Sequence, residues 1–339
     1  MQVTTLVWGI TILVILGLFV FDFFAHVRTP HEPTFRESAF WSAFYIGLAL
    51  AFGGLVVAKW GAGHAGEYYA GFITEKALSV DNLFVFLIIM STFAVPRAYQ
   101  QKVLLIGIVV ALMMRGVFIA VGAAAIGAFS WVFYLFGIFL IYTAAKLLKE
   151  SGHEIEQERK RDSRIVALVR RLVPTTDRFH GDSLTARVDG KRVVTPMLLA
   201  LLAIGFADLL FALDSIPAIY GLTEQPYLVF TANAFALMGL RQLYFLIGGL
   251  LDRLVYLSYG LAAILAFIGV KLVLHALHEN SLPFVNGGEQ VPVPEISTVA
   301  SLSVIIGILV LATGASLWRT GGGARPPEPS DSGIVSRER

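Results

Sequence analysis

The 339-residue chain contains no cysteine and few charged side chains. Without cysteine, neither a disulfide bond nor a thiolate metal site can form. Charged residues make up only 15% of the sequence, whereas about 25% is usual for a soluble domain. The net charge of +2 is too small to indicate a nucleic-acid partner. These shortages argue against a soluble protein and leave a chain that is 56% hydrophobic.

Hydrophobic residues are concentrated in nine runs of roughly 20 residues, the length of helix that crosses a bilayer. The runs lie at about 5–25, 38–58, 69–93, 103–125, 129–148, 196–221, 227–250, 256–277 and 298–318. We therefore predict an all-α fold, a polytopic transmembrane bundle of about nine helices. No Lys or Arg precedes Arg28, so the first run lacks the basic segment of a cleavable signal peptide and is expected to remain as a helix.

Basic residues predict the orientation of this bundle, because cytoplasmic loops of membrane proteins are enriched in Lys and Arg. If the N-terminus lies outside, the inner connections hold most basic residues, whereas the outer loop 279–296 holds three Glu and no base. We expect a multi-pass protein of the bacterial inner (plasma) membrane with a cytoplasmic C-terminus. The segment 150–195 carries both charge signs and is predicted to be a cytoplasmic loop, through which further copies or membrane-protein partners would bind.

Polar residues recur in the same order in two groups of three predicted helices. "TEKALSVDN" in the first group matches "ADLLFALDS" in the second, and "ALMMRGVF" matches "ALMGLRQLYF". The paired positions are Glu75 with Asp208, Asp81 with Asp214, Asn82 with Ser215, Arg115 with Arg241, and Lys146 with Lys271. Because each group has an odd number of helices, the two groups must cross the membrane in opposite directions. This predicts an inverted repeat, an arrangement found in many secondary transporters.

The repeat divides the chain into five parts. Residues 1–66 form two added helices, 67–149 the first three-helix repeat, 150–195 the charged loop, and 196–280 the second repeat. Residues 281–339 hold the ninth helix and a Gly/Pro-rich tail that is predicted to be disordered.

Several charged residues fall inside the predicted membrane spans, where burying an ionised group costs at least about 2.5–3.5 kcal/mol. The expected metal-pathway residues are Glu75, Asp81, Asn82, Asp208, Asp214 and Ser215. Arg115 and Arg241 are expected to form ion pairs that hold the bundle together. Four acids against two arginines still leave an excess of negative charge, unless Lys76 also points inward. Such an excess, with amide and hydroxyl oxygens nearby, favours a site for a hard divalent cation.

Helical geometry leaves the arrangement of the acids open. Glu75, Ser79 and Asn82 lie on one stripe, whereas the second acid of each pair, six residues on, lies about 120° away. Both acids can face one ion only if the helix is locally unwound; otherwise each acid serves a different neighbour. Pro217 favours distortion in the second repeat, because it cannot donate to the carbonyl of Leu213.

The motifs "TEKALSVDNLFVF", "DLLFALDSIPAI" and "NAFALMGLRQLYF", in this order, resemble those of the TerC/Alx family of integral membrane proteins, over roughly residues 5–280. The resemblance implies manganese efflux, manganese homeostasis and tellurium (tellurite) resistance. Carried over by position, it implies metal-pathway acids at Glu75, Asp81, Asp208 and Asp214, with Asn82, Ser215 and Asn233 as neutral oxygen donors. The ninth helix and the tail fall outside the shared motifs.

These observations together predict a transporter that exports a divalent cation by proton exchange. Oxygen donors without cysteine or histidine suit Mn²⁺ or Ca²⁺, and only the family resemblance selects Mn²⁺ as the transported ion. No organic cofactor and no enzymatic activity are expected, because no nucleophile with a base is present. The alternative is a non-transporting membrane accessory or scaffold that supports the metalation or stress resistance of other membrane or secreted proteins.

Two polar pairs near helix ends are further candidates for metal uptake or release. Asp22 and His26 lie at the predicted inner end of the first helix, and His275 and His278 lie at the outer end of the eighth. Polar residues at such positions are more often interfacial anchors.

Overall fold

The computed structural model describes residues 1–28, 31–129, 131–150, 191–247, 256–280 and 285–321, together with Leu282 and parts of 176–188. The side chain of Asp81 lies outside the described part, although its backbone is within a helix. Most of the 150–195 segment and all of the tail beyond residue 321 also lie outside it.

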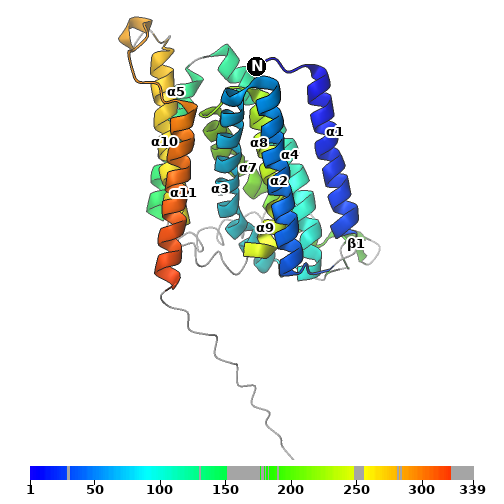
Figure 1. Ribbon diagram of the computed structural model, residues 1–339. Coiled ribbons are helices and arrows are strands. Elements are labelled where there is room, and N and C mark those ends of the chain that lie inside the picture. Colours follow the sequence, from blue (N-terminus) through cyan, green and yellow to red (C-terminus); the bar gives the residue numbers. More distant parts are fainter. Residues whose placement is uncertain are drawn as a thin grey trace, which may run out of the picture.

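The described chain is almost entirely helical (Figure 1). Its helices are α1 (Thr5–Asp22), the π-helical η1 (Phe23–Val27), α2 (Phe35–Trp60), α3 (Ala62–Thr92), α4 (Arg97–Ala128), α5 (Val132–Glu150), α7 (Pro196–Tyr220), α8 (Pro226–Met238), α9 (Leu240–Ile247), α10 (Leu257–His278), the 3-10 turn η3 (Asn286–Gly288) and α11 (Thr298–Gly321). A short antiparallel hairpin of β1 (Thr185–Val188) and β2 (Lys191–Val194) precedes α7.

Local signals in the sequence explain where several helices begin. The hydroxyl of Thr34 accepts a hydrogen bond from the backbone of Glu37 at 3.3 Å and caps the start of α2. Pro196 and Pro226 stand at the first positions of α7 and α8, where a missing N–H costs nothing. Gly61, with a φ of 93°, provides the turn between α2 and α3.

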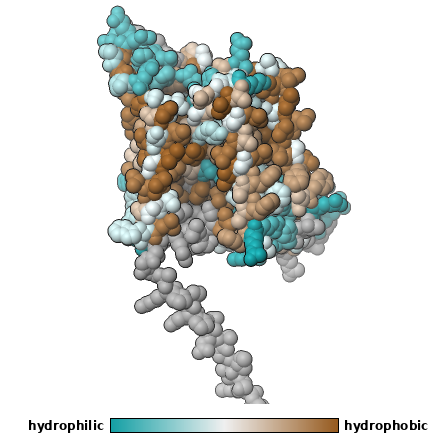
Figure 2. Space-filling model, in the orientation of Figure 1, coloured by the Kyte–Doolittle hydropathy of each residue, from teal (hydrophilic) through white to brown (hydrophobic). Residues whose placement is uncertain are grey.

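Seven described helical segments are long and apolar enough to cross a membrane. They are the α1–η1 segment, α2, α4, α5, α7, α10 and α11. Figure 2 shows the corresponding apolar belt between hydrophilic ends. The prediction of an all-α, polytopic membrane bundle is therefore confirmed. One helix differs from the expectation: the run 227–250 is interrupted at Gly239, where α8 ends and the short α9 begins.

The packing of the helices is reciprocal between the two predicted repeats. The first helix of one repeat packs on the second helix of the other, as α3 on α8 and α7 on α4, and the third helices α5 and α10 pack extensively on each other. A Cβ on Gly137 would lie 2.8 Å from the carbonyl oxygen of Gly269, so glycine allows this close crossing. Such a pattern is what an inverted repeat requires, and the repeat itself stays a prediction.

The added helices enclose this six-helix arrangement from two sides. In Figure 1, α1 and α2 cover one side, and α11 lies at the other, against α3 and α10. The N-terminus and the α10–α11 connection lie at one end of the bundle, and α9 lies at the opposite end (Figure 1).

Candidate functional site

A fully buried arginine stands at the centre of the bundle. Arg115 donates hydrogen bonds to Glu75 on α3, and to both carboxylate oxygens of Asp208 on α7 at 3.1 and 3.2 Å. It also donates to Oγ of Ser215 at 3.1 Å and to Oδ1 of Asn233 at 2.8 Å. Arg115, Glu75 and Asp208 each lie near the middle of a long helix, so the structure brings together charged residues from both predicted repeats. We call the five residues Glu75, Arg115, Asp208, Ser215 and Asn233 the central cluster.

The charges of the central cluster do not balance. Two buried carboxylates, Glu75 and Asp208, face one guanidinium, so these five residues carry one excess negative charge when both acids are ionised. The partly buried Lys76, next to Glu75 on α3, adds a positive charge that acts on Glu75 from outside the cluster. An unpaired charge in such surroundings is costly unless a further cation or a proton joins the cluster. Among the described residues, no three His, Asp or Glu side chains are close enough together to hold a metal by themselves.

Several buried oxygens on α3, including one of Glu75 in the central cluster, have no hydrogen-bond partner among the described residues. They are Glu75 Oε2, Thr74 Oγ1 and Ser79 Oγ, all on α3. Glu75 and Ser79 share the predicted stripe with Asn82, which is also buried. A buried oxygen without a partner costs roughly 1–3 kcal/mol, so these atoms are available to a ligand.

Asp214, the second acid of the second repeat, does not join the central cluster. Thr143 on α5 donates a hydrogen bond to Oδ1 of Asp214 at 3.3 Å, and the charge of Lys146 acts on the same half-buried carboxylate. α7 stays helical through Pro217, so the predicted local unwinding is absent there. Of the two arrangements that the sequence left open, the second repeat shows separate neighbours for its two acids.

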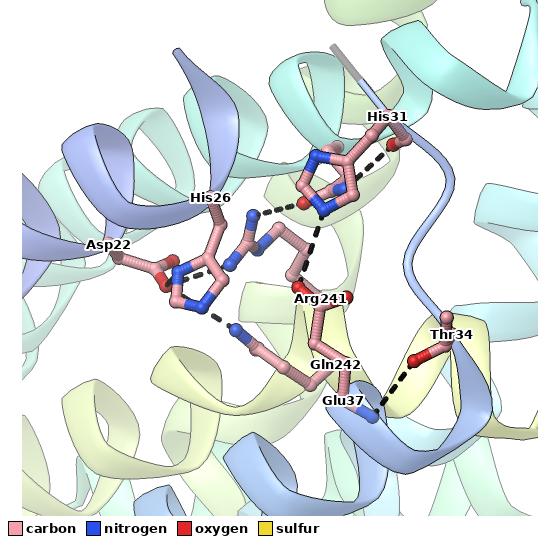
Figure 3. Close-up of polar contacts among 8 residues, drawn as sticks. Asp22, His26, His31, Thr34, Glu37, Arg241 and Gln242 are labelled. Carbon is pink, nitrogen blue, oxygen red and sulfur yellow. Dashed lines mark hydrogen bonds and ion pairs between the residues drawn. The ribbon is translucent and has the colours of Figure 1, made fainter. Parts of the chain in front are cut away.

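The second arginine singled out from the sequence, Arg241, lies near one end of the bundle and not at its centre with Arg115. Arg241, at the start of α9, donates to Asp22 on α1 and to Gln101 on α4, both at 2.7 Å (Figure 3). Tyr45 on α2 donates to the same oxygen of Asp22 at 3.0 Å. The sequence predicted an ion pair for Arg241 but not this partner. Asp22 is the only acid in the first predicted helix, and that isolation was the signal available.

Lys271 is not part of the central cluster. It lines a cavity of about 340 Å³ at the end of the bundle that carries the N-terminus, together with Glu67, Glu224, His275 and Glu295. His275 Nε2 lies 2.9 Å from Oε1 of Glu224, and this hydrogen bond lowers the pKa of the Glu224 carboxyl below its ordinary value. The cavity also includes Glu67, which accepts a hydrogen bond from Thr223 at 2.7 Å and was not singled out from the sequence.

A membrane-length helical bundle with carboxylates and an arginine buried at its centre defines a polytopic integral membrane protein. The chain belongs to the integral membrane protein TerC family, whose sequence profile matches residues 60–322. This confirms the family inferred from the motifs.

Several curated relatives cover nearly the whole chain. An uncharacterized membrane protein of Mycobacterium tuberculosis H37Rv is 53% identical over 96% of this chain and 82% of its own length. An uncharacterized membrane protein of Myxococcus xanthus is 38% identical over 92% of each chain. Alx of Escherichia coli K12, named as a candidate membrane-bound redox modulator, is 34% identical over 93% of this chain and 95% of its own. No solved structure matches the chain at a significant level.

Proposed function

We propose that this protein exports a divalent metal cation, Mn²⁺, across the membrane through the central cluster. The observation that carries the proposal is the charge imbalance at Arg115. Two buried carboxylates from opposite repeats face one arginine, next to unpartnered oxygens on α3. Carboxylate, amide and hydroxyl oxygens are the donors that hard divalent ions prefer.

Arg115 then acts as an internal cation that competes with the transported ion. In the described arrangement it contacts both Glu75 and Asp208, so a divalent ion must displace the guanidinium from at least one of them. Such competition keeps the carboxylates paired when no metal is bound. Asp214, and Asp81 by its position in the repeat, would lie along the path to this centre.

Donor chemistry alone accommodates Mn²⁺ and Ca²⁺ equally, and the family resemblance selects Mn²⁺. Proton exchange fits the same residues, since a carboxylate in low dielectric can accept a proton when the metal leaves. An inward position of the charged loop and an outward N-terminus, as predicted from the basic residues, would make the flux an export.

The test is ion flux in proteoliposomes of purified protein. We expect Mn²⁺ flux that increases when a pH gradient is applied, with Ca²⁺ measured in parallel. Glu75→Gln, Asp208→Asn, Asp81→Asn and Asp214→Asn should each reduce the flux at least about tenfold while the protein still inserts. Glu289→Gln, an exposed acid in the α10–α11 connection, is the matched control and should leave the flux unchanged. Normal flux in all four of these variants would contradict the proposal.

A second candidate is a non-transporting accessory that supports metal loading or stress resistance of other membrane proteins. It is favoured by the contact of Arg115 with both carboxylates, because a closed ion-pair network can serve the fold alone. The redox role in the name of Alx cannot use thiols here, since the chain has no cysteine. A stable complex with a membrane protein that is lost on deletion of 151–175, without any metal flux in liposomes, would support this candidate.

A further inference from the structure

A second buried polar cluster lies at the end of the bundle opposite the N-terminus (Figures 1 and 3). Its centre is the carboxylate of Asp22, the last residue of α1. Oδ1 of Asp22 lies 2.7 Å from an NH2 nitrogen of Arg241, 3.0 Å from the hydroxyl of Tyr45 and 3.2 Å from Nδ1 of His26. All four side chains are buried. We call Asp22, His26, Tyr45 and Arg241 the Asp22 cluster.

The Asp22 cluster is unsuited to a metal ion. The guanidinium of Arg241 already occupies the carboxylate, and Gln101 holds the same guanidinium from the other side at 2.7 Å. A metal would therefore have to displace a buried arginine from its single acid. His26 offers a different chemistry, because imidazole gains and loses a proton near neutral pH.

His26 has a connection to the surface through a small cavity of about 10 Å³. Among the residues that line it are His26, Ser38, Glu37, Arg241 and Gln242. Ser38 Oγ, Arg241 Nε and Gln242 Oε1 are buried and have no hydrogen-bond partner among the described residues. This volume is close to the minimum for one water molecule, and the three atoms supply the polar partners that a buried water needs.

The charged groups around His26 come from three elements. α1 contributes Asp22, α9 contributes Arg241, α2 contributes Glu37 and the hydroxyl of Tyr45, and α4 contributes the neutral Gln101. Glu37 is partly exposed, and its Oε1 lies 3.3 Å from Nε2 of His31 in the α1–α2 connection. With His26 neutral, Asp22 and Arg241 balance each other. A proton on His26 places a second positive charge beside Asp22.

We propose that Asp22 and His26 form a proton-binding site, reached from the surface at Glu37 through one water in the adjoining cavity. Proton binding sets an imidazolium in competition with Arg241 for one carboxylate, which weakens the hold of α1 on α9. α9 is the short helix that follows the break at Gly239. A use of this site in proton-coupled export rests on the proposed function, whereas proton binding itself does not.

The test uses the indole of Trp41, which stands edge-on to the His26 ring with 4.5 Å between centroids. A protonated imidazole quenches the fluorescence of an adjacent indole. We expect the Trp41 emission, obtained as wild type minus Trp41→Phe, to rise in one step as the pH is raised from about 5 to about 8. His26→Gln should abolish the step, and the matched His31→Gln should keep it.

A second preparation that retains Trp41 as its sole tryptophan gives the same signal directly, should subtraction be disturbed by misfolding of Trp41→Phe. An absent step in both preparations, or a step that survives in His26→Gln, would overturn the proposal. None of these readouts requires metal transport, so failure of the export test would leave them intact.

Discussion

Two buried arginines in equivalent predicted repeat positions have different surroundings. Arg115 stands at mid-depth between the two repeats and faces two carboxylates, whereas Arg241 stands near one end of the bundle and faces one. The partner of Arg241 comes from α1, a helix outside the repeat. The central cluster therefore carries an excess negative charge, and the Asp22 cluster is balanced while His26 is neutral.

In our two proposals, this difference separates a site for a divalent ion from a site for a proton. The central cluster has more negative than positive charge, and Glu75 Oε2 has no hydrogen-bond partner among the described residues. An added cation is therefore expected to lower the electrostatic energy of the cluster. In the Asp22 cluster any added cation competes with a cation already present. Equivalent positions in the predicted repeat thus have different surroundings, because an added helix supplies a new partner to one of them.

The largest expected effect that separates the two clusters comes from removing each arginine. Arg115→Gln leaves two buried carboxylates facing each other, and we expect a loss of stability of at least about 3–5 kcal/mol. Arg241→Gln leaves only Asp22, which keeps the hydroxyl of Tyr45, so its loss should be smaller. Reversible unfolding of the purified variants in detergent measures both losses.

A double variant tests whether charge causes the difference. Adding Glu75→Gln to Arg115→Gln removes one of the stranded carboxylates and should recover part of the lost stability. Equal losses for the two single variants, or no recovery in the double variant, would contradict the charge imbalance on which the comparison rests.

An intermediate effect is expected at Lys76, which links the central helix α3 to the break before α9. Its Nζ donates a hydrogen bond to the carbonyl oxygen of Ala236 at 3.0 Å, and a Cβ on Gly239 would lie 3.2 Å from that nitrogen. Lys76→Met leaves the carbonyl at the end of α8 unpaired and should cost about 1–3 kcal/mol.

Hydrogen exchange of the α9 amides measures the effect of this change, which should be faster exchange in 241–247. Lys59→Met is the matched control, because the exposed Lys59 lies over the ring of Trp60 in the last turn of α2, at the end of the bundle opposite α9. If both variants leave α9 exchange unaltered, Lys76 does not stabilise the break between α8 and α9.

The smallest effect is expected at the exposed pair of Glu224 and His275, a reference for the two buried clusters. Glu224 is 51% exposed, so Glu224→Gln should cost no more than about 1 kcal/mol. Its pKa is lowered by the hydrogen bond to His275, so the stabilisation is present above the ordinary carboxyl pKa and is lost as pH falls through the lowered value.

The protection of the backbone amides at 221–225, corrected for the intrinsic exchange rate at each pH, should therefore fall on acidification from about pH 5 to about pH 3 in wild type. Glu224→Gln should show the lower protection already at pH 5. A loss of global stability in Glu224→Gln as large as the loss in the arginine variants would contradict the expected difference between exposed and buried ion pairs.

Much of the fold was predictable from the sequence, because a bilayer imposes a fixed helix length. The nine apolar runs correspond to helical segments of the described chain, and the motifs predicted the family correctly. The break at Gly239 was not predicted, since glycine is common within membrane helices and its effect depends on Lys76 from another helix.

The candidate site was predictable in its residue types but not in its pairing. Periodicity placed Glu75 on one stripe with Ser79 and Asn82, the repeat aligned Asp208 with Glu75, and the structure brings the two acids together at Arg115. The partners of Arg241 and Asp214 depend on which helices become neighbours, and no local pattern in the sequence encodes the contact of α9 with α1. Whether the paired acids bind metal stays a prediction.

The most direct test of the central claim is equilibrium binding of Mn²⁺ to purified protein, followed by electron paramagnetic resonance of the free ion. The account predicts one bound Mn²⁺ per chain, lost in Glu75→Gln and in Asp208→Asn but retained in Asp22→Asn. Binding that persists in both central variants, or that disappears only in Asp22→Asn, would contradict it.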